Sequence, residues 1–158
     1  MCCNRDPEVE RRIRRGRRRQ VMWKVYTWGG PAPGWRSMFL CCRSDIPGGY
    51  DEPSIVQAPS TSYGMHGFRS RKAANAMAEW DNWLSLRRGS CSFRSTAVRC
   101  TYDKADVMAA GHWSDKMEDG SYPGTVVVRV MRIDDAGWQR LQQRPGGAAE
   151  YRHTPGNV

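Results

Sequence analysis

The chain is 158 residues long and carries 25 Lys and Arg against 16 Asp and Glu, a formal net charge of +9. This length favours one domain with a core of its own. No apolar run reaches the roughly 20 residues of a membrane span, and no apolar stretch follows the first basic residues, as it would in a secretory signal. We therefore expect a cytoplasmic protein without a membrane partner.

The first segment, residues 1–20, holds eight arginines and three acids and so carries more than half of the net charge. Its only apolar residues after Cys3 are Val9 and Ile13, which predicts no packing face. We interpret residues 1–20 as an Arg-rich tail before the folded domain. Whether residues 1–21 belong to the native product stays open, because a start at Met22 would also give a compact chain.

Hydrophobic periodicity predicts the next elements. Residues 21–28 alternate and are rich in β-branched and aromatic side chains, which predicts a strand, and 37–42 predict a second, shorter one. Residues 43–64 mix Pro, Gly, Ser and Asp without a period, which indicates a long surface loop. A helix is predicted over 70–87, with Ser70 as its N-cap. Its apolar stripe consists of Ala73, Ala74, Met77, Trp80 and Leu84.

The last third of the chain predicts two more strands, at 96–102 and 125–133. In the second, Val126, Val128 and Val130 would share one face, with Val127, Arg129 and Met131 on the other. A short helix over 134–143 and a flexible tail over 144–158 complete the chain. The economical architecture is α+β, a small, mostly antiparallel sheet packed on one main helix with long loops, in a single domain over 21–143.

The six cysteines predict neither a zinc site nor a disulfide framework. None forms a C-x-x-C pair, and the three histidines are not at ligand spacing from them, whereas zinc sites use such paired spacing. Without a secretory signal, disulfides are not expected either. We expect no metal and no resident cofactor.

The densest polar cluster lies just before the predicted helix, at 63–70. Glycines there permit unusual backbone angles, and the helix N-terminus offers free N–H groups to an anion. A purely structural strand-to-helix turn competes with a ligand site as the interpretation. The candidate ligand-binding residues are Tyr63, His66, Arg69 and Ser70.

The stretch Gly-Met-His-Gly-Phe-Arg-Ser at 64–70, followed by an alanine-containing helix, resembles the G-x-H-x-F-x-S segment of small uncharacterised phage and bacterial domains. Those domains also begin with a W-K-V-type strand and end with strands similar to 97–111 and 126–133. More distantly, the order of elements is similar to the ADP-ribosyltransferase-like fold, which includes the RNA 2′-phosphotransferases. That resemblance implies a cleft for NAD between two small sheets, with Ser70 or Tyr63 at the position of the central motif. The last strand carries no glutamate, so no catalytic set is carried over.

Three functions stay open. The first is a small phage accessory protein that binds a host macromolecule or a nucleotide-like ligand without catalysis, and the second is an ADP-ribosyltransferase-like enzyme that uses NAD. The third is nucleic-acid binding by the Arg-rich segment, because arginines neutralise phosphates and release counterions. The partner would be a host protein or a nucleic acid in the cytoplasm of the host cell. The candidate nucleic-acid-binding residues are Arg11, Arg12, Arg14, Arg15, Arg17, Arg18 and Arg19.

Overall fold

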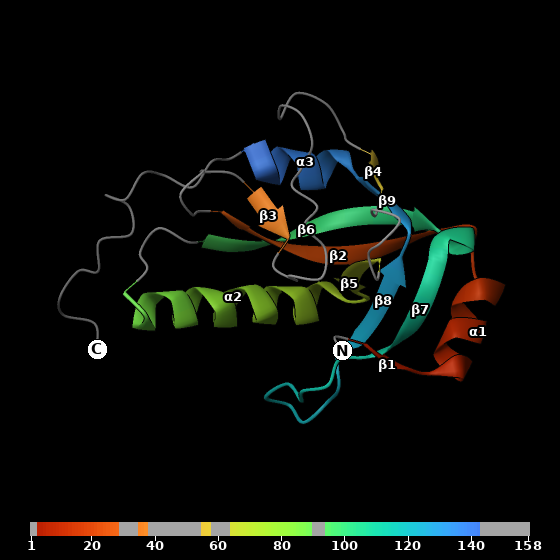
Figure 1. Cartoon of the computed structure of the whole chain (residues 1–158), viewed down its shortest axis with the longest axis horizontal. Helices are drawn as coiled ribbons and strands as arrows, with labels where there is room; N and C mark the ends of the chain where they lie inside the picture. Colours follow the sequence, from red (N-terminus) through yellow and green to blue (C-terminus); the bar gives the residue numbers. More distant parts are fainter. Residues whose placement is uncertain (1–2, 29–34, 38–54, 58–63, 90–93, 143–158) are drawn as a thin grey trace.

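The computed structural model describes residues 3–28, 35–37, 55–57, 64–89 and 94–142 (Figure 1). They form an antiparallel sheet with helices on both of its faces, which confirms the predicted α+β class. The helices are α1 (Pro7–Arg15), α2 (Arg71–Arg87) and α3 (Asp135–Gln142), with a 3-10 turn, η1, at Lys104–Asp106. The strands are β1 (Asn4–Arg5), β2 (Arg19–Trp28), β3 (Trp35–Ser37), β4 (Ile55–Gln57), β5 (Met65–Phe68), β6 (Arg94–Asp103), β7 (Val107–His112), β8 (Gly124–Val128) and β9 (Val130–Ile133).

The order of strands in the sheet is β1-β7-β8-β5-β2-β6-β9-β4, with β3 paired to β2. The central pair is β2 and β6, which are in register over their whole lengths, from Arg19 opposite Asp103 to Trp28 opposite Arg94. Because successive side chains of a strand point to opposite faces, β2 supplies both sides of the sheet. Met22 and Tyr26 enter one core cluster, and Val25 enters the other.

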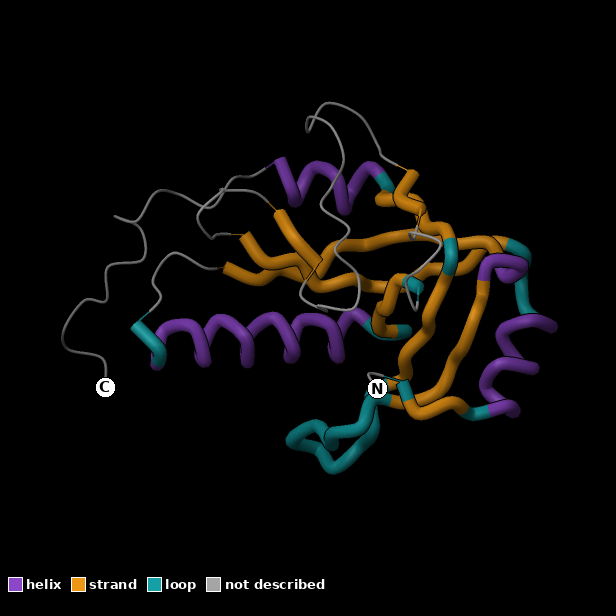
Figure 2. The backbone as a smooth tube through the Cα atoms, viewed as in Figure 1, coloured by secondary structure: helices purple, strands orange, loops and turns teal. Residues whose placement is uncertain are grey.

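The sheet is curved (Figure 2), and the chain bends at Arg129 between β8 and β9. Arg129 alone separates β8 from β9 in the chain, yet three strands lie between them in the sheet order. The stretch therefore pairs with β5 and β7 before the bend, and with β6 and β4 after it. The extra residue shifts the alternation, so that Val128 and Met131 enter the same buried cluster. The prediction of one continuous strand with Met131 on the opposite face is thus wrong.

Two clusters of buried side chains hold the sheet and the helices together. The smaller one lies under α2 and contains Val25, Phe68, Ala73, Ala74, Ala78 and Ala97. The larger one lies on the other face, where α1 and α3 add their apolar residues to those of the strands. Its members are Val9, Ile13, Met22, Tyr26, Met65, Val98, Cys100, Tyr102, Val107, Ala110, Val126, Val128, Met131, Ile133 and Leu141.

Helix α2 begins as predicted, because the Ser70 hydroxyl accepts a hydrogen bond of 3.2 Å from the Ala73 N–H. Its buried stripe differs from the prediction at Trp80, which is 53% exposed, and Ala78 is buried instead. The carboxylate of Asp81, next to Trp80, accepts hydrogen bonds from Ser95 and Thr27 of the sheet. These bonds fix the rotation of α2 that leaves Trp80 in solvent.

The N-terminal segment is folded, so the prediction of a tail without a packing face is wrong. Strand β1 pairs with β7, and the side chains of Val9 and Ile13 on α1 are 7% and 3% exposed. The Asp6 carboxylate accepts hydrogen bonds from the N–H groups of Glu8 and Val9 and caps the helix. Two apolar residues four positions apart make a sufficient contact because β1 and the cap hold α1 against β7.

Other predictions fall in or near the undescribed segments. The loop expected over 43–64 contains the strand β4, which pairs with β9. Most of the strand expected over 37–42, and the tail expected over 144–158, lie outside the described residues. The short helix predicted over 134–143 is observed as α3, and the strand predicted over 96–102 is observed as β6.

Candidate functional site

His66, the centre of the predicted ligand site, lies inside the sheet. It is on β5, opposite Val127 of β8, and is 6% exposed. Burial lowers the pKa of its imidazole to about 4, with a further contribution from the positive charge of Lys24. The ring is therefore neutral at pH 7 and lies in the folded interior.

Lys24 is a buried cation that the sequence pattern does not reveal. It occupies an inward position on β2, is 0% exposed, and donates a hydrogen bond of 3.2 Å from Nζ to the main-chain carbonyl of His66. Its Nζ also lies 5.8 Å from the centre of the Tyr26 ring. A charged group in this position ties β2 to β5, because a buried ammonium must keep its hydrogen-bond acceptors.

The remaining residues of the predicted ligand site do not converge with His66. The Ser70 hydroxyl is engaged as the cap of α2, and Tyr63 lies outside the described residues. Arg69 is exposed, and its N–H donates to the carbonyl of Gly124 on β8 over 2.8 Å. Of the described members of this set, only Arg69 has a side chain that is exposed and does not cap a helix.

The predicted nucleic-acid-binding arginines are on an ordered scaffold. Residues at i and i+4 share one face of a helix, so Val9 and Ile13 turn one face of α1 to the core and leave Arg11 and Arg15 on the opposite face. Gly16 ends the helix, and Arg19 begins β2. All seven arginines are exposed, and they follow α1 and the start of β2.

Three of these arginines already have partners. Arg12 lies 3.6 Å from Glu8 on the same helix, and Arg18 donates to the Asp103 carboxylate over 2.8 Å. Arg14 donates to the main-chain carbonyl of Val107 over 3.1 Å, which fastens α1 to β7. The other four, Arg11, Arg15, Arg17 and Arg19, have no acidic partner within the described part of the chain. Of these, Arg11 and Arg15 share the outer face of α1, and we call these two residues the arginine face.

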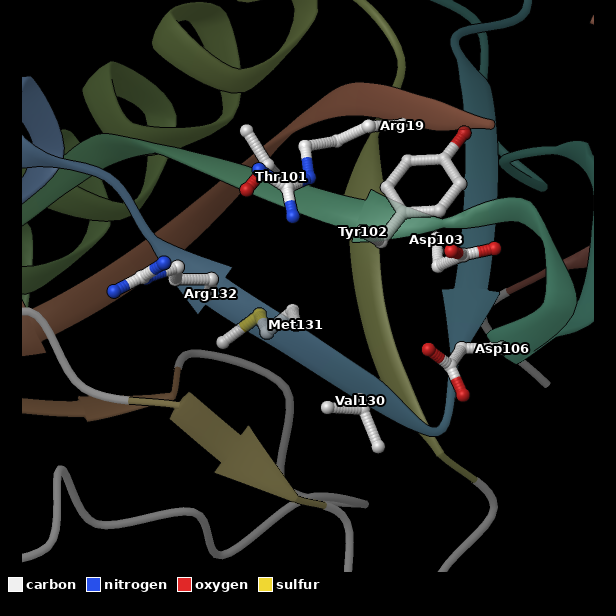
Figure 3. Close-up of a pocket in the computed structure, with 8 residues that line it drawn as sticks. All are labelled: Arg19, Thr101, Tyr102, Asp103, Asp106, Val130, Met131 and Arg132. Carbon is white, nitrogen blue, oxygen red and sulfur yellow. The ribbon is translucent and has the colours of Figure 1, made fainter. Parts of the chain in front are cut away.

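A hollow of about 160 Å³ lies at the ends of β2, β6 and β9, beside Arg19 (Figure 3). Arg19 stands opposite Asp103, and Thr101 stands opposite Arg132, so the register places these side chains on one face of the sheet. Arg132 is exposed and has no acidic partner among the described residues. The hollow is lined by Arg19, Thr101, Tyr102, Asp103, Asp106, Val130, Met131 and Arg132.

The hollow offers two kinds of polar chemistry. The guanidinium groups of Arg19 and Arg132 are suited to phosphate oxygens, which they can bind through two parallel N–H groups. Asp103 is neutralised by Arg18, and hydrogen bonds from the Ala105 N–H and from Arg18 lower the pKa of its carboxyl. The contribution of Arg132 could be foreseen only with the register of β6 and β9, because it lies more than 100 residues from Arg19 in the sequence.

The described residues do not assemble an alternative chemical centre. Among them, no group of three or more His, Cys, Asp or Glu side chains could hold a metal ion. Cys3 and Cys100 are both free and buried, and burial raises the pKa of the Cys100 thiol to about 12, so it stays protonated at neutral pH. No helix within the described ranges is both long and apolar enough to cross a membrane.

Comparisons with known proteins leave the arginine face as the main guide to function. The sequence matches no protein-family model, and neither a curated protein nor a solved structure matches the chain.

Proposed function

We propose that the protein binds nucleic acid through its phosphate backbone, with the arginine face as the contact surface. The observation that carries the proposal is the placement of Arg11 and Arg15 on the outer face of a helix whose inner face is buried. Guanidinium groups without acidic partners, carried on an anchored helix, keep their positive charge for an anionic partner. This narrows the binding function predicted from the sequence to one class of macromolecule.

The carboxylates near the arginine face cancel only part of its positive charge. Glu8 and Glu10 face Arg12 and Arg5, and Asp103 faces Arg18, so most of the nearby carboxylates have a basic partner already. The net excess of positive charge therefore falls on the arginine face. Binding through this surface is expected to be independent of sequence, because phosphate contacts position a nucleic acid but carry no base information.

The test is the salt dependence of binding. We would measure the affinity for a fluorescein-labelled 20-base-pair duplex by fluorescence anisotropy between 50 and 200 mM KCl. The double variant Arg11→Gln/Arg15→Gln should lower the affinity and reduce the slope of log K against log [salt] by about 1.8, or about 0.9 for each lost phosphate contact. The matched control is Arg87→Gln/Arg88→Gln, which removes the same charge at the far end of α2.

The control variant shows whether binding depends on the arginine face or on the net charge of the whole protein. If the two double variants reduce affinity and slope equally, the net charge of the protein drives binding and the arginine face is not the contact surface. An affinity of the unmodified protein that does not change with salt would also overturn the proposal. A far larger loss in the α1 variant than in the α2 control supports it.

A further inference from the structure

A second hollow, of about 390 Å³, lies at the N-terminal end of α1. Its lining consists of Asn4 from β1, His112 from the end of β7, and Trp113 and Tyr122 from the two ends of the following loop; we call it the aromatic hollow. The hollow is open to solvent rather than enclosed, so it offers a surface against which a flat group can lie. Two aromatic rings, an amide and an imidazole give it flat apolar surfaces with hydrogen-bonding groups beside them.

The loop between Trp113 and Tyr122 is held in place on both sides. The Trp113 N–H donates to the Pro123 carbonyl over 2.8 Å, and the Trp113 ring lies 5.8 Å from the ring of Phe68, at 52°. The loop is tied to α2 by the ion pair between Lys72 and Asp119, at 2.9 Å. The loop and the Trp113 ring are therefore held in place, whereas the Tyr122 ring is 50% exposed and has the Lys116 ammonium 5.5 Å from its centre.

A row of three residues across the sheet brings Arg69 to this hollow. Gly124 of β8 stands opposite His112 of β7, and on its other side it accepts the hydrogen bond from the N–H of Arg69. Gly124 has no side chain, and a Cβ built there would lie 3.5 Å from Cδ of Arg69. The Arg69 side chain thus lies along Gly124, which is on the strand next to that of His112. It adds a positive charge beside the hollow.

The polar groups of the aromatic hollow retain hydrogen-bonding capacity. Nε2 of His112 lies 3.6 Å from the Asp6 carboxylate, whereas its Nδ1 is buried and has no hydrogen-bond partner among the described residues. Asn4 is exposed opposite His112 and offers both a donor and an acceptor. Asp6 also caps α1, so the hollow and the arginine face lie at the two ends of one short helix.

We propose that the aromatic hollow binds one unpaired base of a single-stranded nucleic acid whose phosphates lie along the arginine face. The inference rests on the proposed function and adds to it a preference for single strands. The base stacks on the ring of Tyr122 or Trp113, and Asn4 contacts its edge, as aromatic platforms do in single-strand binding proteins. At 1.5 Å per residue, the nine residues of α1 span about 14 Å, roughly four nucleotide steps of a stacked strand.

The test compares two oligomers of twelve nucleotides, an oligothymidylate and an abasic oligomer with the same backbone, by fluorescence anisotropy. The unmodified protein should bind the oligothymidylate about 5- to 150-fold more tightly, the effect of one stacked base. Tyr122→Ala should bring this ratio close to one, whereas Tyr122→Phe should keep most of it. The matched control is Trp80→Ala, which removes an aromatic ring of similar exposure on α2 and should keep the ratio.

Failure of this inference can be distinguished from failure of the proposed function. If neither oligomer binds but the 20-base-pair duplex does, the base site is overturned and the arginine face stands; if the duplex does not bind either, both are overturned. If both oligomers bind equally and with strong salt dependence, the arginine face stands and the base site falls. If Trp80→Ala removes the ratio and Tyr122→Ala does not, the base lies on α2 and the inference is wrong. The variant Arg11→Gln/Arg15→Gln should weaken both oligomers and leave their ratio unchanged.

Discussion

Helices α1 and α2 pack on opposite faces of the same sheet (Figure 1), but their buried faces consist of different kinds of side chain. Helix α1 is nine residues long and buries two branched side chains, Val9 and Ile13. Helix α2 is seventeen residues long and fully buries only alanines, among them Ala74. A short helix with few apolar residues therefore needs a cap and a neighbouring strand, whereas a long helix can approach a sheet closely along small side chains.

The outward faces of the two helices differ as well. Helix α1 turns arginines to the solvent, whereas α2 exposes Trp80 and Trp83. Basic residues of α2 lie at its two ends, Arg71 and Lys72 at the start and Arg87 and Arg88 at the finish, whereas Arg11 and Arg15 follow the outer face of α1. The comparison also supplies matched controls, since each helix carries exposed residues that can be changed without touching the core.

The largest expected effect tests whether α1 is an integral part of the fold. Ile13→Ala should lower the free energy of unfolding by about 2 to 5 kcal/mol, because it removes a buried branched side chain and leaves a cavity. The measurement is urea unfolding followed by circular dichroism. Arg11→Ala on the exposed face of α1 is the control and should change stability by less than about 0.5 kcal/mol. Equal, small effects of both variants would mean that α1 does not dock.

The close approach of α2 to the sheet predicts the next effect. Ala74→Leu should destabilise the protein by about 1 to 3 kcal/mol, because the enlarged side chain has no space at a position that is 0% exposed. Ala76→Leu, on the exposed face of the same helix, should be nearly neutral. Thermal unfolding of the two variants checks the prediction, and an unchanged melting temperature for Ala74→Leu would show that α2 is not packed as closely as described.

The helix caps are expected to contribute less. Asp6→Ala and Ser70→Ala should each cost about 1 kcal/mol, because each leaves N–H groups of the first helical turn without an acceptor. Asp6→Asn keeps an acceptor and should restore most of the loss. If Asp6→Asn were as unstable as Asp6→Ala, the negative charge near His112 would matter more than the cap.

The smallest effect at neutral pH comes from the titration of His66. Burial holds its folded pKa near 4, whereas an unfolded histidine titrates near 6.5. The unfolded chain thus binds the proton first, so the contribution to stability is complete above pH 6.5 and is lost as the pH falls from 6.5 to 4. Unfolding midpoints measured across this window should decline more steeply for the unmodified protein than for His66→Gln. Parallel pH profiles would contradict the buried placement of His66.

The sequence allows α2 to be predicted because its signals are local. Ser70 is a preferred N-cap, and Gly89 beyond the helix adopts a positive φ of 71°, which suits glycine. The orientation of the helix was harder to foresee, since Trp80 extends the apolar stripe in the sequence. The hydrogen bonds of Asp81 to Thr27 of β2 and Ser95 of β6, which no local pattern reveals, turn Trp80 to the solvent.

The bend at Arg129 and the docking of α1 could not be predicted from local pattern. The run of valines around Arg129 has the same alternation as a straight strand, and nothing in it marks the shift in register. For α1, the two apolar residues are too few to predict a packing face, and their partners on β7 are about 100 residues away. The sequence therefore names the arginines as candidates beside the His66 turn, but it predicts neither the scaffold that carries them nor the position of Arg132.

The pairing of β1 with β7 has a consequence for synthesis of the protein on the ribosome. Asn4 and Arg5 are translated more than 100 residues before their partners His112 and Gly111. At about 5 to 20 residues per second, the first strand waits roughly 5 to 20 seconds for its neighbour. During this interval the arginines of the nascent chain have no fixed arrangement, and the row along α1 is completed only late in translation.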